Sequence, residues 1–104
     1  MKIVIQPAAR QDILDQFFYL FGQGVEDVAD RFIDGVNESV ATLAKRPTLG
    51  SPKKLKNPRL HGLRRWPVAE FPVIRIYYIT KDDELRIIRV LHGKRDVDQI
   101  LGEE

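Results

Sequence analysis

The chain has 104 residues, of which 43% are hydrophobic and 31% charged, a composition ordinary for a soluble globular protein. This length allows one core, so we expect residues 1–104 to form a single domain. With no cysteine and two histidines, disulfides and thiolate metal sites are excluded, and we expect neither a metal nor a cofactor. No apolar run approaches the roughly 20 residues that a membrane-spanning helix needs.

Charge is segregated along the chain, although the formal net charge is only +2. The segment from Ser39 to Ala69 has no acidic residue, whereas residues 1–38 and 70–104 are each net acidic. Its basic residues are Lys45, Arg46, Lys53, Lys54, Lys56, Arg59, Arg64 and Arg65. Such a block attracts anionic partners. Whether it faces nucleic acid, an acidic protein or only solvent remains open. The N-terminus lacks the apolar segment of a signal peptide, so we expect a cytoplasmic protein.

The first elements are a short strand and a helix. Lys2–Gln6 is rich in β-branched residues, and Pro7 suits the first turn of a helix. The helical spacing i, i+3, i+4, i+7 then produces one apolar stripe, made of Leu14, Phe17, Phe18 and Phe21. Gly22-Gln23-Gly24 ends this helix and begins a tight connection.

A second, longer helix is predicted to end near Arg46, because Pro47 stops it. Its apolar side consists of Val25, Ala29, Phe32, Ile33, Val36, Val40 and Leu43. Gly35 lies in its interior, where glycine is unfavourable by about 1 kcal/mol relative to alanine. We attribute Gly35 to close contact with the first helix.

The segment from Pro47 to Gly62 has neither helical nor strand periodicity and is predicted to be a loop. Loops of this length in compact domains tend to be functional or mobile, and the sequence does not establish whether this one is ordered.

Three consecutive strands follow, at Leu63–Val68, Phe71–Thr80 and Glu84–His92, with Lys81-Asp82-Asp83 as the tight turn between the last two. Pro67 and Pro72 indicate an edge, bulge or turn around Ala69-Glu70.

Alternation along these strands separates two faces of the sheet. One face carries Ile74, Ile76 and Tyr78, and the other carries Val73, Arg75, Tyr77 and Ile79. In the last strand, alternation groups Ile88 with Val90 and opposes them to Ile87, Arg89 and Leu91. We expect one face to take both helices and the other to expose arginine and tyrosine among apolar residues.

The tail from Asp96 to Leu101 is predicted to be a short helix capped by Asp96. The order is therefore β-α-α-β-β-β, an α+β fold in which a small antiparallel sheet packs against a helical hairpin.

Several phrases of the sequence resemble the ParE branch of the ParE/RelE toxin superfamily, over nearly the whole chain. They are Leu63-Arg64-Arg65-Trp66-Pro67-Val68, Phe71-Pro72, Ile76-Tyr77-Tyr78 and Arg89-Val90-Leu91-His92-Gly93-Lys94-Arg95-Asp96. The resemblance implies a RelE-like fold and the toxin half of a bacterial type II toxin–antitoxin pair. It also implies a hetero-oligomer with a cognate antitoxin encoded beside the toxin.

Two mechanisms are known on this fold. ParE-type toxins are associated with inhibition of DNA gyrase, and RelE-type toxins cleave mRNA on the ribosome. In the second case, the resemblance makes Arg75 and His92 the candidate catalytic residues, since such chemistry needs a positioned base and a cation near the phosphate. The tail beyond Asp96 lacks the tyrosine or further histidine of many RelE-type nucleases. We therefore favour a non-enzymatic gyrase inhibitor over an mRNA endoribonuclease.

The remaining candidates are binding residues. We expect the target to contact Arg64, Arg65, Arg89, Lys94 and Arg95, and the antitoxin to contact Phe17, Phe18, Phe21 and Trp66. Trp66 also fits a residue at the edge of the core, and His92 one whose ring bonds a backbone carbonyl. A third hypothesis is a plain nucleic-acid-binding module that uses the basic stretch Lys53–Arg65.

Overall fold

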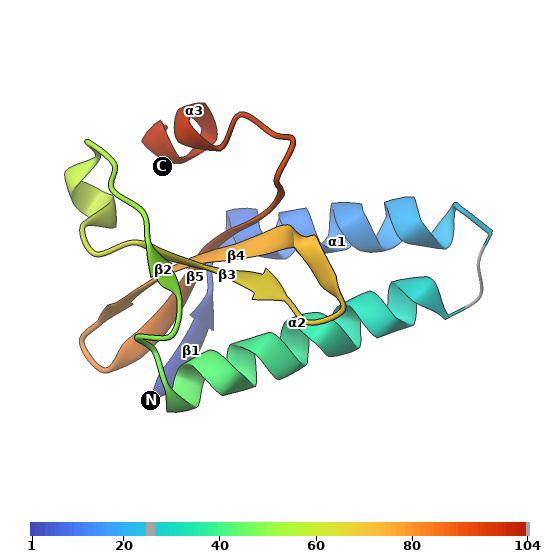
Figure 1. The fold of residues 1–104 in the computed structure, drawn as a ribbon, viewed down its shortest axis with the longest axis horizontal. Helices are drawn as coiled ribbons and strands as arrows, with labels where there is room; N and C mark the ends of the chain where they lie inside the picture. Colours follow the sequence, from blue (N-terminus) through green and yellow to red (C-terminus); the bar gives the residue numbers. More distant parts are fainter. Residues whose placement is uncertain (25–26, 104) are drawn as a thin grey trace.

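Two helices lie on one face of a five-stranded sheet in the computed structural model, which describes residues 1–24 and 27–103 (Figure 1). This confirms the α+β fold. In chain order the elements are β1 Lys2–Ile5, α1 Pro7–Phe21, α2 Val28–Lys45, β2 Ser51–Pro52, a 3₁₀ turn Pro58–Leu60, β3 Arg64–Val68, β4 Phe71–Lys81, β5 Glu84–His92 and α3 Val97–Gly102.

The sheet is mixed, which corrects the expectation of a wholly antiparallel one. Its strand order is β1-β5-β4-β3-β2, and β1 runs parallel to β5 while the other neighbours are antiparallel. The two helices lie between β1 and the later strands in the chain, and this long crossover allows β1 to join the edge of the sheet in the same direction as β5.

The helices begin and end where local chemistry requires. Pro7 occupies the first turn of α1, and α2 ends at Lys45, just before Pro47. Of the predicted apolar side of α2, Ala29, Phe32, Val36, Val40 and Leu43 are buried and Ile33 is partly buried; Val25 lies outside the described residues. In α1 the residues that pack inward are Ala9, Ile13 and Leu20, not the more conspicuous stripe of large side chains.

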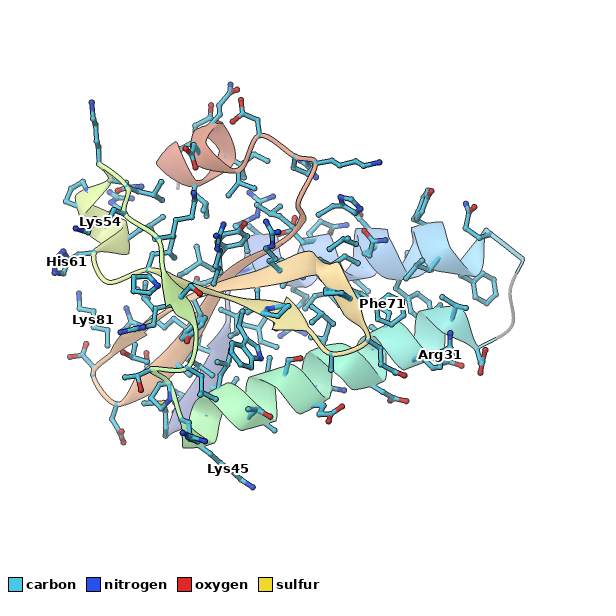
Figure 2. The ribbon with its side chains drawn as sticks, in the orientation of Figure 1. Arg31, Lys45, Lys54, His61, Phe71 and Lys81 are labelled. Carbon is cyan, nitrogen blue, oxygen red and sulfur yellow. The ribbon has the colours of Figure 1, made fainter. Side chains whose placement is uncertain are left out.

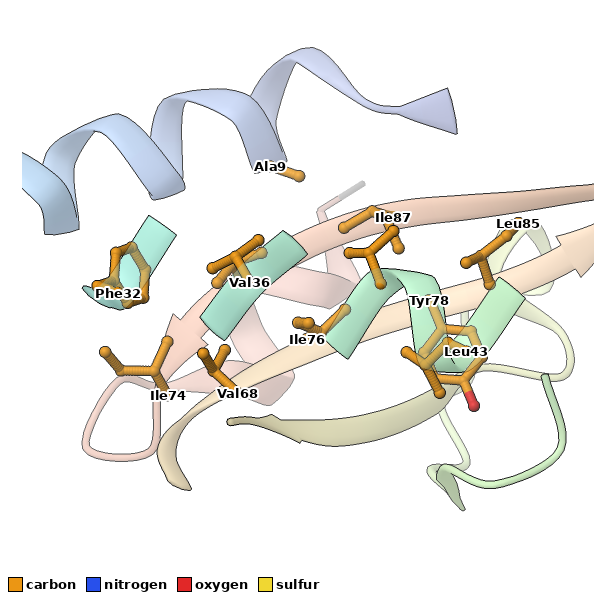
Figure 3. Close-up of a cluster of buried hydrophobic side chains, with 12 residues drawn as sticks. Ala9, Phe32, Val36, Leu43, Val68, Ile74, Ile76, Tyr78, Leu85 and Ile87 are labelled. Carbon is orange, nitrogen blue, oxygen red and sulfur yellow. The ribbon is translucent and has the colours of Figure 1, made fainter. Parts of the chain in front are cut away.

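An inner cluster of buried side chains fills the space between the helices and the sheet (Figure 3). Phe32, Val36 and Leu43 from α2 meet Ile76 and Tyr78 from β4 there. Its other buried members are Ala9, Val40, Val68, Ile74, Leu85, Ile87 and Val90.

The described part of the chain includes no helix long and apolar enough to cross a membrane.

An outer cluster buries the opposite face of the sheet, so the expectation of an exposed face there is wrong. Its members are Leu60, Leu63, Tyr77, Ile79, Ile88, Leu91 and Leu101, with Leu55, Val97 and Ile100 packed against them. The cover consists of residues 53–63 and α3, which Figure 1 shows on the side of the sheet away from α2. Tyr77 and Tyr78 are thus both buried, one in each cluster. The predicted loop also contains β2 and the 3₁₀ turn.

A β-bulge changes the alternation predicted for β5. Tyr77 pairs with Arg89 but Tyr78 pairs with Ile87, so Ile88 is an extra residue in β5. Val90 consequently lies with Ile87 in the inner cluster, whereas Ile88 belongs to the outer cluster. Strict alternation grouped Ile88 with Val90, because it had no means of locating the bulge.

The turns follow their sequence signals. Asp82 and Asp83 have φ values of 54° and 59°, which is the left-handed pair of a two-residue hairpin turn. Ala69 and Glu70 form the turn between β3 and β4, and Asp96 caps α3 by accepting a hydrogen bond from Gln99 N at 3.3 Å.

Gly35 is explained differently from our expectation. A Cβ at this position would clash with the carbonyl oxygen of Ala69 and lie 3.2 Å from Val68 Cγ1. The close neighbour of Gly35 is therefore the turn between β3 and β4, and not the first helix.

Candidate interaction surfaces

An aromatic patch, defined as Leu14, Phe17, Phe18 and Phe21, lies on the solvent side of α1. Phe18 and Phe21 are 64% and 69% exposed, which is unusual for phenylalanine. The ring of Phe17 stacks on Phe21 at a centroid distance of 6.2 Å and meets Phe18 edge-on at 5.5 Å. Contiguous exposed aromatic surface is typical of a site where another protein docks.

Trp66 does not join this patch. Its side chain is half-buried on the helix side of β3, opposite Ile76, and packs against the inner cluster. It lines a separate hollow of about 500 Å³ together with Thr42 of α2 and Pro67. The structure therefore brings together the three phenylalanines predicted to contact an antitoxin, but places Trp66 at a second location.

Arg89 has an internal carboxylate partner. Its Nε and Nη2 atoms donate to the two oxygens of Asp12 at 2.7 and 2.8 Å, and Val90 N donates to the same carboxylate at 3.0 Å. The Arg89 side chain is 17% exposed and that of Asp12 is 8% exposed. The ion pair joins α1 to the bulged part of β5, and sequence reasoning missed it because the two residues are 77 positions apart.

Arg64 also has internal partners. Its Nη1 donates to the carbonyl oxygens of Thr48 and Gly50 at 3.2 and 2.7 Å. Beside it, the Tyr78 hydroxyl donates to Pro47 O at 2.7 Å and accepts from Gly50 N at 2.9 Å. Burial raises the pKa of Tyr78, although the Gly50 hydrogen bond and the Arg64 charge act against the increase. These contacts fix the connection between α2 and β2 against the sheet.

The other three predicted target-binding cations are exposed. Arg65 pairs with Tyr77 in the sheet and so lies on the outer face, while Lys94 and Arg95 follow β5. None of the three side chains has an ion pair or hydrogen bond to the described residues. They are available to a partner, whereas Arg64 and Arg89 also maintain the fold.

Arg75 and His92 lie on opposite faces of the sheet. Arg75 pairs with Leu91 of the outer cluster, and His92 pairs with Ile74 of the inner cluster. Paired residues share a face, so these two side chains leave the sheet on opposite sides, and Arg75 Nη1 extends toward Gly93, the neighbour of His92. The imidazole of His92 accepts a hydrogen bond through Nδ1 from Lys94 N at 3.1 Å, a backbone amide where we expected a carbonyl. Within residues 1–24 and 27–103 no three metal-binding side chains cluster.

Comparison with known proteins gives consistent results. A family described as ParE toxin of type II toxin–antitoxin system, parDE, matches residues 3–97. A solved structure of a chromosomal ParDE toxin–antitoxin system from P. aeruginosa superposes with a TM-score of 0.71 at 16% identity, covering 88% of this chain and 95% of that one. A copper-bound mutant toxin from Helicobacter pylori superposes with a TM-score of 0.54 at 23% identity, covering 88% and 93%. These identities are low, so the two structures establish the fold alone. No curated protein matches significantly by sequence.

Proposed function

Since the chain belongs to the ParE toxin family of type II toxin–antitoxin systems, we propose that it binds and inhibits DNA gyrase and is neutralised by a cognate antitoxin. In this proposal the protein acts in the cytoplasm and forms a hetero-oligomer with the antitoxin. Its outward cations, Arg65, Lys94 and Arg95, contact the target. Arg64 and Arg89 contribute by holding the neighbouring backbone in place.

The observation that favours inhibition by binding over RNA cleavage is the position of Arg75 and His92 on opposite faces of the sheet. Cleavage at a ribose 2′-hydroxyl needs a base and a cation that reach the same phosphate. Arg75 leaves the sheet on the outer face and His92 on the inner one, an arrangement that disfavours contact of both side chains with a single phosphate.

The aromatic patch is the proposed antitoxin site. A segment that is disordered alone and folds on the toxin loses conformational entropy, and it must bury enough apolar surface to offset this loss. The exposed phenylalanines provide such surface. The hollow at Trp66 is a second apolar contact on another element. An antitoxin segment that reaches both has to extend across the helical layer.

The gyrase proposal is tested with the purified chain in a supercoiling assay, beside an mRNA cleavage assay in a translating extract. We expect supercoiling to be inhibited and mRNA to remain intact. Replacing Arg65, Lys94 and Arg95 by alanine should weaken the inhibition, and Arg75→Ala and His92→Ala should leave it unchanged. Cleavage of mRNA that Arg75→Ala and His92→Ala abolish would instead establish the ribonuclease.

The antitoxin proposal is tested by co-purification with the product of the adjacent gene. Removing a central aromatic side chain from an interface commonly weakens binding by about 2 kcal/mol, or roughly 30-fold. We expect Phe18→Ala and Phe21→Ala each to have an effect of this size without unfolding the toxin, because both side chains are exposed. Tyr19→Ala is the matched control, since Tyr19 is 62% exposed on the same helix but outside the patch. Absence of a complex with the unmodified toxin would refute this part of the proposal.

A further inference from the structure

The segment over the outer face of the sheet presents cations on a fixed frame. Leu55 and Leu60 pack into the outer cluster, while Lys54, Lys56 and Arg59 are exposed. We call these three residues the cationic ridge. Lys54 and Lys56 flank the partly buried Leu55, and Arg59 precedes the buried Leu60, so the apolar anchors hold the backbone while the charges are exposed. Figure 2 labels Lys54 beside the 3₁₀ turn, at the periphery of the molecule.

Polar contacts fix the same frame. Asn57 accepts a hydrogen bond from Arg59 N at 3.0 Å and donates from Nδ2 to Leu101 O of α3 at 3.2 Å. Lys53 pairs with Asp98 of α3 at 2.8 Å, and its backbone N donates to Leu63 O at 2.9 Å. The ridge is therefore attached to the sheet and to α3, and its charges are not on a flexible tail.

The charges of the ridge are not paired with any carboxylate of residues 1–24 and 27–103. Lys54, Lys56 and Arg59 have no ion pair or side-chain hydrogen bond to the residues that the structure describes. Asp98, the carboxylate of α3, lines the same hollow as Lys54 and Lys56, but its ion pair is with Lys53. Neighbouring like charges that lack counterions create a local positive potential, which favours a polyanion.

From this arrangement we propose that the cationic ridge binds the phosphodiester backbone of duplex DNA. The segment from Pro47 to Arg65 contains no Phe, Tyr or Trp and offers only the ring of His61 for stacking an unpaired base, which disfavours single strands. Lysine and arginine held in a row contact phosphates and give binding that does not depend on base sequence. An acidic antitoxin segment is the competing ligand, but the exposed apolar surface that such a segment requires lies on α1. The inference extends the proposed function, because gyrase acts on DNA, but DNA binding itself depends only on the ridge.

The test measures binding of the purified full chain to a fluorescent DNA duplex by anisotropy at several salt concentrations. Each phosphate contact contributes about 0.9 to the slope of log affinity against log salt. The variant Lys54→Gln/Lys56→Gln/Arg59→Gln should therefore lower the slope by about three and weaken binding at low salt more than tenfold. A duplex of unrelated sequence should bind equally well, and single-stranded DNA or RNA more weakly.

The matched control is Arg31→Gln/Lys45→Gln/Arg46→Gln, which removes the same number of charges from exposed side chains on α2 and its C-terminal end. We expect this control to change the slope by less than one, so that an effect of net charge alone is separated from an effect of position. An unchanged melting temperature of both variants verifies that the fold is intact.

The proposal is overturned if the duplex does not bind at low salt, if the control variant lowers the slope as much as the ridge variant, or if polyglutamate displaces the duplex at equal charge concentration. The gyrase assay is read separately. Loss of supercoiling inhibition by the unmodified chain would contradict the proposed function, while ridge-dependent DNA binding would still support this inference.

Discussion

The two faces of the sheet are both buried, but by covers of different construction. The inner face lies under two long helices, whose side chains interlock with those of the strands. The outer face lies under residues 53–63, which are largely irregular, and under the six-residue helix α3. The outer cover also leaves a hollow of about 640 Å³ between residues 54–58 and α3. We infer that the inner cover unfolds with the whole molecule and that the outer cover opens locally at a smaller free energy.

Leu43→Ala should have the largest effect, because Leu43 is fully buried between α2 and the sheet. Replacement of a buried leucine by alanine removes apolar contacts and leaves a cavity, and we expect a loss of about 4 kcal/mol in the free energy of unfolding. Urea denaturation monitored by circular dichroism measures this loss. A loss below about 2 kcal/mol would contradict the picture of a rigid inner cover.

Leu101→Ala is the matched change on the outer face, since Leu101 is also fully buried. We expect a smaller loss of about 2.5 kcal/mol, because a short helix can shift to fill part of the cavity. Hydrogen exchange should show faster exchange in α3 than in α2 for this variant. If Leu43→Ala and Leu101→Ala destabilise the protein equally, then the two covers do not differ in rigidity.

Tyr78→Phe tests the hydrogen bonds by which β4 holds the connection between α2 and β2. The variant leaves Gly50 N and Pro47 O without their partner, and we expect a loss of about 1.5 kcal/mol. The pKa of Tyr78 is raised in the folded state above the ordinary value of 10.0, so the neutral hydroxyl stabilises the fold fully below pH 10.0. This contribution decreases as the pH rises through the folded-state pKa.

The pH dependence gives Tyr78→Phe its own control. Thermal unfolding followed from neutral to strongly alkaline pH should show the difference between the parent protein and the variant becoming smaller above pH 10.0. A difference that is constant over this range would indicate that the hydroxyl titrates as it does in the unfolded chain.

Asp98→Asn should have the smallest effect. The Asp98 side chain is 74% exposed, although its oxygen lies 2.8 Å from Lys53 Nζ. Exposed ion pairs contribute little, so we expect a loss of less than about 0.5 kcal/mol that disappears at high salt. Thermal melts at low and high salt measure it, and a loss that salt does not reduce would mean that the pair is more shielded from water than its exposure indicates.

Elements with a clear period were predictable from the sequence. The buried side of α2, the three later strands and the Asp82-Asp83 turn follow directly from the spacing of apolar residues and from turn chemistry. The burial of the outer face was not predictable, because the apolar residues of 53–63 show no helical or strand spacing. Their contacts with α3 join segments that are far apart in the sequence. The partners of Arg64 and Arg89 were missed for a related reason, since nothing local distinguishes a paired arginine from a free one. The exposed aromatic side of α1 was visible as a stripe, but spacing alone does not indicate which side of a helix meets the sheet.

The bulge in β5 has a consequence for how this hairpin tolerates change. Because Asp12 binds both Val90 N and Arg89, it recognises one alignment of β5 and no other. An insertion or deletion of one residue within β5 would bring a different amide to that carboxylate and reverse which side chains enter each core. Length variation among natural or engineered versions of this chain should therefore accumulate elsewhere, because in the folded protein Asp12 couples the alignment of β5 to the position of α1.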